Sequence, residues 1–169
     1  GARAVVPSPG ARFAVGWTSW TVLGPSRTIR EDSEPNNNSI SLLVQVQRDL
    51  AATSYLLAGD LEPVGQGDLM AHSGELAVDV VKVPHHGSAR QQPRLPQWAH
   101  ARAAVISCGE DNDYGHPAAS TVAAWQASGA QVLRTDLQGD VIVVGEPSGS
   151  SPRLFTRKLP RLASQSRIR

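Results

Sequence analysis

The sequence predicts one α/β domain, a sheet with helices packed against it, followed by a short basic segment. Hydrophobic residues make up 40% of the 169 residues and charged residues 18%, proportions typical of a soluble globular chain with a core. Short apolar runs of strand character alternate with stretches of helical character, which is the pattern of α/β folds. We therefore assign residues 1–150 to the domain and residues 151–169 to a flexible tail.

Apolar runs rich in β-branched residues mark the expected strands. The clearest is residues 78–83, VDVVKV, which Pro84 ends. Residues 55–59, YLLAG, form a shorter buried run that ends at Asp60, and residues 48–54 before it are expected to be a connection. The other expected strands lie within residues 13–23 and at residues 40–47, 104–108, 131–135 and 140–145, of which the last two finish the sheet.

Helices are expected between these strands. Residues 63–73 begin with proline, which suits the first turn of a helix, and Leu69 is expected on the buried side. Another helix is expected to begin at Pro117 and to end near Gly129, which occupies the position of a C-terminal capping glycine. Residues 97–103 are a further helical candidate.

Polar residues with metal-ligand chemistry follow three of the expected strands. Asp60 follows one strand, His85 and His86 stand side by side after the next, and a loop that ends at His116 follows the third. Because open α/β sheets bind ligands where loops meet at the C-terminal ends of strands, we expect these side chains to converge. A carboxylate and imidazoles brought together suit Zn²⁺, Mn²⁺ or Fe²⁺.

Each of these residues also has a structural interpretation when it is taken alone. Asp60 could cap the helix that follows it. Either of the adjacent histidines could be a hydrogen-bonded turn residue, and His116 could simply end a loop before Pro117. The order and spacing of the whole set are more specific than any one member.

Five segments stand in an order that is typical of one family: NNNSISLLVQV, YLLAGDLE, DVVKVPHHGS, AVISCGEDNDYGHP and QVLRTDLQGDVIV. Together they resemble the later half of the metallo-β-lactamase-like domain of ComEC-type DNA-internalisation competence proteins. The resemblance runs from about Asn37 to Val144, and VPHHGS and YGHP are its most distinctive parts. Residues 1–24 fit only loosely, and the basic tail does not fit.

The resemblance implies a metallo-β-lactamase-like αβ/βα sandwich with a metal site at one edge of its two sheets, of which this chain holds mainly the second half. It implies that Asp60 is a catalytic residue and the carboxylate that bridges two metal ions. It also implies that the VPHHGS turn supplies a metal-ligand histidine, either His85 or His86. His116 matches the YGHP histidine, a catalytic residue at the site edge. The residues implied to contact the substrate are Asn38, Ser39, Lys82, Ser88 and His116.

The implied activity is metal-dependent hydrolysis of DNA phosphodiesters, which in this family would degrade the strand that is not taken up. Two ions, Mn or Zn, would lower the pKa of a bridging water and neutralise charge on the phosphate. Lys82 would contact the phosphate, although a solvated lysine at a strand end is an equal alternative. The implied partners are DNA, single-stranded or duplex, and the rest of a polytopic bacterial membrane channel protein. The domain would lie on the extracytoplasmic side, with no nucleotide cofactor.

The chain departs from the family pattern in its first part. The superfamily carries a metal-binding loop of the form H-x-x-x-D-H in its first sheet, but the earliest histidine here is His72. That loop lies in sequence outside this chain, has been removed, or has been lost in a degenerate relative. We therefore expect this chain to be inactive by itself. Two other functions stay open: a catalytically inactive module that binds DNA or a partner, and a hydrolase of the same fold that acts on a small phosphoester or lactone.

Charge is distributed unevenly along the chain. Residues 1–150 hold ten Lys/Arg and all fifteen Asp/Glu, so their net charge is 10 − 15 = −5, whereas residues 151–169 hold six Lys/Arg and no acid, giving +6. The acidic body argues against strong nonspecific DNA binding, because phosphate contacts dominate such affinity. The basic tail could reach phosphates or anionic lipid, and a solvated terminus is the alternative.

Overall fold

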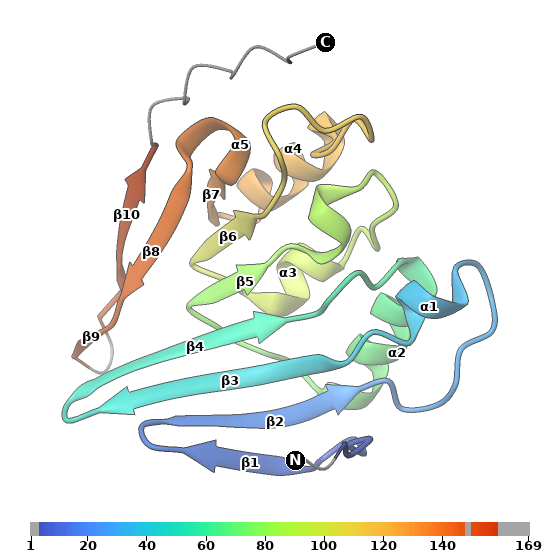
Figure 1. Ribbon diagram of the computed structural model, residues 1–169, viewed down its shortest axis with the longest axis horizontal. Coiled ribbons are helices and arrows are strands. Elements are labelled where there is room, and N and C mark those ends of the chain that lie inside the picture. Colours follow the sequence, from blue (N-terminus) through green and yellow to red (C-terminus); the bar gives the residue numbers. More distant parts are fainter. Residues whose placement is uncertain (1–3, 148–149, 159–169) are drawn as a thin grey trace, which may run out of the picture.

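The structure, a computed structural model, describes residues 4–147 and 150–158 (Figure 1). Its centre is one mixed sheet, which confirms the predicted α/β class. The first four strands pair antiparallel, and the fourth to the seventh pair parallel. Across the sheet the order is β1 (Arg12–Val15), β2 (Thr18–Gly24), β3 (Ser41–Arg48), β4 (Ala51–Leu57), β5 (Val80–Lys82), β6 (Ala103–Ile106) and β7 (Gln131–Arg134).

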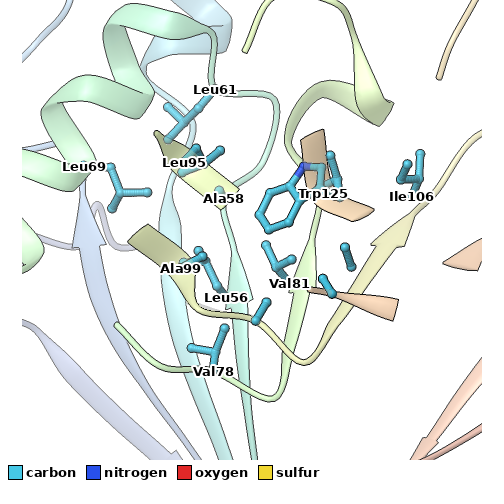
Figure 2. Close-up of a cluster of buried hydrophobic side chains, with 14 residues drawn as sticks. Leu56, Ala58, Leu61, Leu69, Val78, Val81, Leu95, Ala99, Ile106 and Trp125 are labelled. Carbon is cyan, nitrogen blue, oxygen red and sulfur yellow. The ribbon is translucent and has the colours of Figure 1, made fainter. Parts of the chain in front are cut away.

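One face of the sheet packs against helices and forms the core (Figure 2). Leu56, Val81 and Ala104 are register partners in adjacent strands, so they point to the same face, and all three are fully buried. Trp125 is the largest fully buried side chain in this layer and belongs to the same cluster. The helices on this face of the sheet are α2 (Pro63–Ser73), α3 (Leu95–Ala99) and α4 (Ala119–Ala127), and Trp125 belongs to α4.

The opposite face of the sheet is covered over only part of its width. A separate antiparallel pair, β8 (Asp140–Val144) with β10 (Arg153–Arg157), continues into β9 (Glu146–Pro147), which pairs with the start of β4. Near β1 the same face is open, since Phe13 is 40% exposed and Val15 71% exposed. Among the described residues, no helix lies over this face at β1, where Phe13 and Val15 are exposed.

Several expected elements agree with the structure, and two differ in an informative way. The helix predicted at residues 63–73 and the strand at 40–47 are confirmed as α2 and β3. The connection predicted over 48–54 is wrong, because β4 begins at Ala51 after a tight turn in which Asp49 has a φ of 54°. The neighbouring strand β3 supplies the ladder that residues of weak β-propensity need.

The expectation that residues 140–145 finish the main sheet is also wrong. Helix α5 (Thr135–Gln138) and Gly139, with a φ of 73°, redirect the chain after β7, so β8 leaves the sheet and pairs with β10. Residues 153–157, assigned to the tail, therefore form a strand, and residues 159–169 lie outside the described residues. In the part of the chain that the structure describes, no helix has the length and apolar character to cross a bilayer.

Candidate functional site

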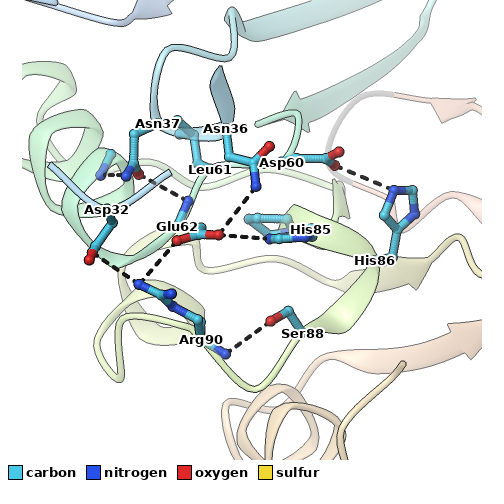
Figure 3. A network of polar contacts seen from close by, with 12 residues as sticks. Asp32, Asn36, Asn37, Asp60, Leu61, Glu62, His85, His86, Ser88 and Arg90 are labelled. Atoms are coloured by element: carbon cyan, nitrogen blue, oxygen red, sulfur yellow. Dashed lines mark hydrogen bonds and ion pairs between the residues drawn. The ribbon is translucent and has the colours of Figure 1, made fainter. Parts of the chain in front are cut away.

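Three loops meet at the edge of the sheet where β4, β5 and β6 end (Figure 3). These strands run parallel, so their C-terminal ends lie at the same edge, as in other open α/β sheets. Strand β3 begins at this edge because it runs antiparallel to β4. The loops are residues 58–62, residues 107–118 and the turn η1 (Pro84–Gly87), and α1 (Glu34–Asn37) precedes β3.

The turn after β5 holds its two histidines in a strained backbone conformation. His85 has φ 47° and ψ 45°, and His86 has φ 53° and ψ 25°, a left-handed conformation that costs a non-glycine residue roughly 1–3 kcal/mol. Gly87 follows with a φ of 77°. Backbone hydrogen bonds from His85 N to Gly59 O, at 3.2 Å, and from Ala118 N to Gly87 O, at 2.8 Å, hold the turn in place. Strain of this kind is concentrated at functional sites.

Asp60 connects its own loop, residues 58–62, to the turn η1 through its contact with His86. Its Oδ1 lies 3.5 Å from His86 Nε2 and 3.3 Å from Lys82 Nζ. The Lys82 ammonium also donates to Gly59 O at 3.0 Å, and the Asp60 N–H donates to Ser39 Oγ at 3.1 Å. A Cβ on Gly59 would stand 2.6 Å from Ser39 Cβ, so glycine permits this close approach.

The hydrogen bond of His86 determines which of its nitrogens faces Asp60. His86 Nδ1 lies 2.6 Å from Ser107 O, and a carbonyl oxygen only accepts, so Nδ1 carries the hydrogen. In a neutral His86 the bare Nε2 then faces the Asp60 carboxylate. Nε2 and Asp60 Oδ1 are then two acceptors 3.5 Å apart, an arrangement that favours a positive charge close by. That charge can be a proton on Nε2, the Lys82 ammonium or a metal ion.

The Asp60 and His86 pair therefore fits one side of a divalent-metal shell. A carboxylate oxygen and an imidazole nitrogen are ligands for Zn²⁺ or Mn²⁺, and a second hydrogen bond that fixes the imidazole is common at such sites. Within residues 4–147 and 150–158, no group of three or more His, Cys, Asp or Glu side chains is placed to hold a metal ion.

A buried carboxylate behind His85 was missed at the level of sequence. The Glu62 side chain is 5% exposed, and it forms an ion pair with Arg90 Nη2 at 3.1 Å and accepts from Asn36 Nδ2 at 3.2 Å. Its Oε1 lies 3.6 Å from His85 Nδ1, and Arg90 also pairs with Asp32 at 3.1 Å (Figure 3). The sequence offered one signal for Glu62: it stands two residues after Asp60, the first candidate ligand, in the same turn.

His116 joins the two adjacent histidines. Its ring centroid lies 5.6 Å from that of His85, and Tyr114 stacks on it at 6.0 Å. Asn112 fixes the His116 backbone, since Oδ1 accepts from His116 N at 3.1 Å and Nδ2 donates to His116 O at 2.8 Å. Burial, followed by the charges of His85 and His86, lowers the pKa of His116 below its ordinary value.

Two residues predicted to contact the substrate make hydrogen bonds inside the protein. Asn38 Nδ2 donates to Ile29 O at 2.6 Å and to Glu34 O at 2.7 Å, so both of its amide hydrogens are used. Ser88 is 5% exposed, and its Oγ accepts from Arg90 N at 3.2 Å. These contacts give both residues a structural role, and their contact with a substrate stays a prediction.

Comparison with known proteins relates the chain to bacterial competence proteins. It matches no protein-family model. It is 32% identical over 112 residues to ComE operon protein 3 of Bacillus subtilis (strain 168), a match that covers 66% of this chain and 14% of that protein. It is 30% identical over 117 residues to Competence protein ComA of Neisseria gonorrhoeae, covering 65% of this chain and 16% of that protein. The chain thus spans a small part of the length of both relatives.

Proposed function

We propose that this chain supplies part of a site that hydrolyses DNA phosphodiesters within a longer competence protein. Two relatives with competence names support a role in DNA uptake. The observation that carries the proposed chemistry is the approach of His86 Nε2 to Asp60 Oδ1, at 3.5 Å, with His86 Nδ1 held by Ser107 O. That arrangement prepares a carboxylate and an imidazole to hold a cation at the edge of the sheet.

Divalent metal, Mn or Zn, is the group that we propose for this site, with two ions in the complete site. When bound, it would activate water and neutralise charge on the phosphate. Asp60 and His86 would hold it, and the Lys82 ammonium, at 3.3 Å from Asp60 Oδ1, would stay beside the anionic substrate. The other ligands would come from the rest of the longer protein.

His116 would accept a proton or a hydrogen bond during this reaction. Because burial and the neighbouring histidines lower its pKa, the ring is neutral at neutral pH and has a bare nitrogen that accepts a proton or a hydrogen bond. Tyr114 stacks on the ring at the exposed end, where a nucleotide would approach. Asn112 keeps the loop in the position that this role requires.

The setting that we propose follows from the family resemblance of the sequence and not from the site. DNA, single-stranded or duplex, would be the substrate, and the rest of a membrane channel protein would be the physical partner. The domain would face the extracytoplasmic side of the bacterial cell membrane. We propose that the chain alone has little activity, because the described residues provide only the Asp60 side of the metal shell.

The test compares the longer protein with two single substitutions. Asp60→Asn keeps the shape of the side chain but removes its charge, so bound Mn or Zn and the degradation of DNA are both expected to fall at least tenfold. Asp49→Asn is the matched control, because this carboxylate is 91% exposed in the turn at the opposite end of β4. Metal content by elemental analysis and release of nucleotides from labelled DNA are the measurements. Normal metal content and activity in Asp60→Asn would contradict the proposal.

A module that binds DNA or a protein partner without catalysis is the second candidate. The observation that favours it is the lack, among the described residues, of three potential ligands placed around one ion. It predicts that the longer protein holds no metal and degrades no DNA, yet still binds DNA with unchanged affinity after Asp60→Asn. Filter-binding measurements on the same three proteins separate the two candidates.

A further inference from the structure

The buried carboxylate of Glu62 does not cap the helix that follows it. It stands at the position before α2 where a capping side chain would bond to the helix, but it makes no such bond. Instead its own backbone N–H donates to Asn37 Oδ1 at 3.2 Å, and its carboxylate turns toward Asn36, Arg90 and His85. A buried charge is costly unless several partners surround it, so this orientation needs a reason.

His85 provides that reason. Its Nδ1 is buried and has no hydrogen-bond partner among the described residues, and Glu62 Oε1 is 3.6 Å away. A buried polar atom without a partner is destabilising, and closing this gap by a few tenths of an ångström would form a charge-assisted hydrogen bond. The strained turn fixes the His85 backbone, so the ring has little freedom to seek another acceptor.

We propose that Glu62 is a positioning residue that keeps the hydrogen of His85 on Nδ1 and leaves Nε2 free for the site. The inference deepens the proposed function. It rests on that function only for the role of the free Nε2 of His85 in the site. His86 has the same arrangement with a different partner, since its Nδ1 faces the carbonyl of Ser107 at 2.6 Å. Both adjacent histidines thus direct Nδ1 into the protein.

The groups that face Nδ1 of the two histidines differ in charge: a carboxylate at His85 and a neutral carbonyl at His86. Glu62 Oε1 lies 3.6 Å from His85 Nδ1, whereas Asp60 Oδ1 lies 3.5 Å from His86 Nε2, so the nearby carboxylate stands at a different nitrogen in each ring. Arg90, held by Asp32 at 3.1 Å, balances the charge of Glu62 and keeps it in place.

The competing explanation is that Glu62 and Arg90 merely attach the loop after η1 to the start of α2. The two explanations differ in what Glu62→Gln does. Arg90 only donates, so the amide oxygen of a glutamine would face Arg90 and its NH2 would face His85, with the Asn36 amide turned so that its oxygen accepts from that NH2. A donor opposite Nδ1 would move the hydrogen of His85 to Nε2. A role limited to attachment would leave the hydrogen where it is.

The experiment is a histidine ¹⁵N NMR spectrum of the chain at about pH 8, where an ordinary histidine is neutral. The His85 signals are assigned by their loss in His85→Gln. We expect wild-type His85 to carry its hydrogen on Nδ1 and Glu62→Gln to carry it on Nε2. Arg90→Gln is the matched control, because it breaks the same ion pair but keeps the carboxylate, and it is expected to keep the wild-type form.

Two results would overturn the inference, and one of them needs no variant. Hydrogen on Nε2 in the wild-type protein contradicts it directly, even if Glu62→Gln does not fold. An unchanged His85 in folded Glu62→Gln contradicts it as well. In the longer protein, Glu62→Gln is expected to lower DNA degradation roughly 10–100-fold. If the wild-type longer protein degrades no DNA, the proposed function fails while the NMR result still decides the role of Glu62.

Discussion

The backbone of the turn that carries the adjacent histidines limits what each residue there tolerates. His85, His86 and Gly87 all have positive φ, an arrangement in which two non-glycine residues bear strain. Gly87 also lies against the loop that ends at His116, because Ala118 N donates to its carbonyl at 2.8 Å. The position of two candidate loops therefore depends on one glycine.

We predict that Gly87→Ala destabilises the protein by about 2–4 kcal/mol, since it adds a Cβ at a φ of +77° and into occupied space. That atom would stand 2.7 Å from Pro117 Cβ and 3.1 Å from Ile106 Cγ2. Gly129→Ala is the control, because its φ is +90° but no heavy atom lies within 4 Å of the added Cβ, so about 1–2 kcal/mol is expected. Urea denaturation measures both, and equal losses would contradict the role of the contact.

The lowered pKa of His116 predicts a loss of stability on the acid side of neutrality. Below the ordinary histidine value of about 6.5, the unfolded chain binds a proton at this ring more readily than the folded chain does. The free energy of unfolding therefore falls as pH decreases from about 7 to 5. In His116→Asn this contribution is missing, so the decrease should be shallower. Urea midpoints at several pH values measure it, and parallel curves for the two proteins would show that the histidine contributes nothing.

At the scale of elements, a small cluster joins the ends of β6 and β7 to α5. The Thr135 hydroxyl accepts from Cys108 N at 2.8 Å and donates to Cys108 O at 2.7 Å. Asp136 accepts from Arg134 Nη2 at 2.6 Å and from the Cys108 thiol at 3.2 Å. Hydrogen bonding to Arg134 lowers the pKa of Asp136, so the stability from this pair is present above the ordinary carboxyl pKa and is lost as pH falls below it.

The same cluster makes Cys108 a poor nucleophile. Burial, and after it the Asp136 carboxylate, raises the pKa of the thiol. In Asp136→Asn the pH midpoint of alkylation by iodoacetamide should move down, because a charge that opposes the thiolate is gone. Asp140→Asn, an exposed carboxylate that pairs with Arg157, is the control. A faster reaction with an unchanged midpoint would instead mean that the substitution only opens access to the sulfur.

Pairing between elements decided two features that local patterns did not predict. Residues 51–54 read AATS, a weak strand pattern, yet they form a ladder with β3 across a tight turn. Residues 140–144 have strong strand character, but their partner is β10, which arises from residues assigned to the tail. Strand propensity reflects the neighbours that a strand finds, so it predicts that a strand exists better than it predicts its partner.

At the scale of the whole molecule, the charge of the chain is divided between an acidic body and a basic end. The end contains three arginines beyond the described residues, Arg161, Arg167 and Arg169. If they contact DNA phosphates, removing them should make the affinity less sensitive to salt. For a chain that stops at Lys158, the slope of log affinity against log salt concentration should be smaller in magnitude by at most about 3, roughly 0.9 per contact. Fluorescence anisotropy with labelled duplex DNA measures the slope, and equal slopes would exclude these contacts. Replacing the three arginines with glutamine is the matched control for the loss of length.

The sequence alone determined the α/β class, most of the strands, the position of α2 and the set of polar residues at the ends of the strands. These features depend on short-range causes: hydrophobic periodicity, β-branched runs, and the proline and glycine residues that start and stop elements. The convergence expected of Asp60, His85, His86 and His116 is visible in the contacts of Asp60 with His86 and of His85 with His116.

Only the tertiary structure decided which side chains stand behind those residues. Glu62 and Arg90 lie in different loops, and the carbonyl of Ser107 reaches His86 from a third, so no local pattern predicts that they contact each other or the histidines. They also distinguish the two adjacent histidines, which are identical in the sequence: His86 faces Asp60, and His85 faces Glu62. The physical reason is that the proton position and the basicity of an imidazole depend on the partner of its other nitrogen, and the fold alone brings that partner into contact.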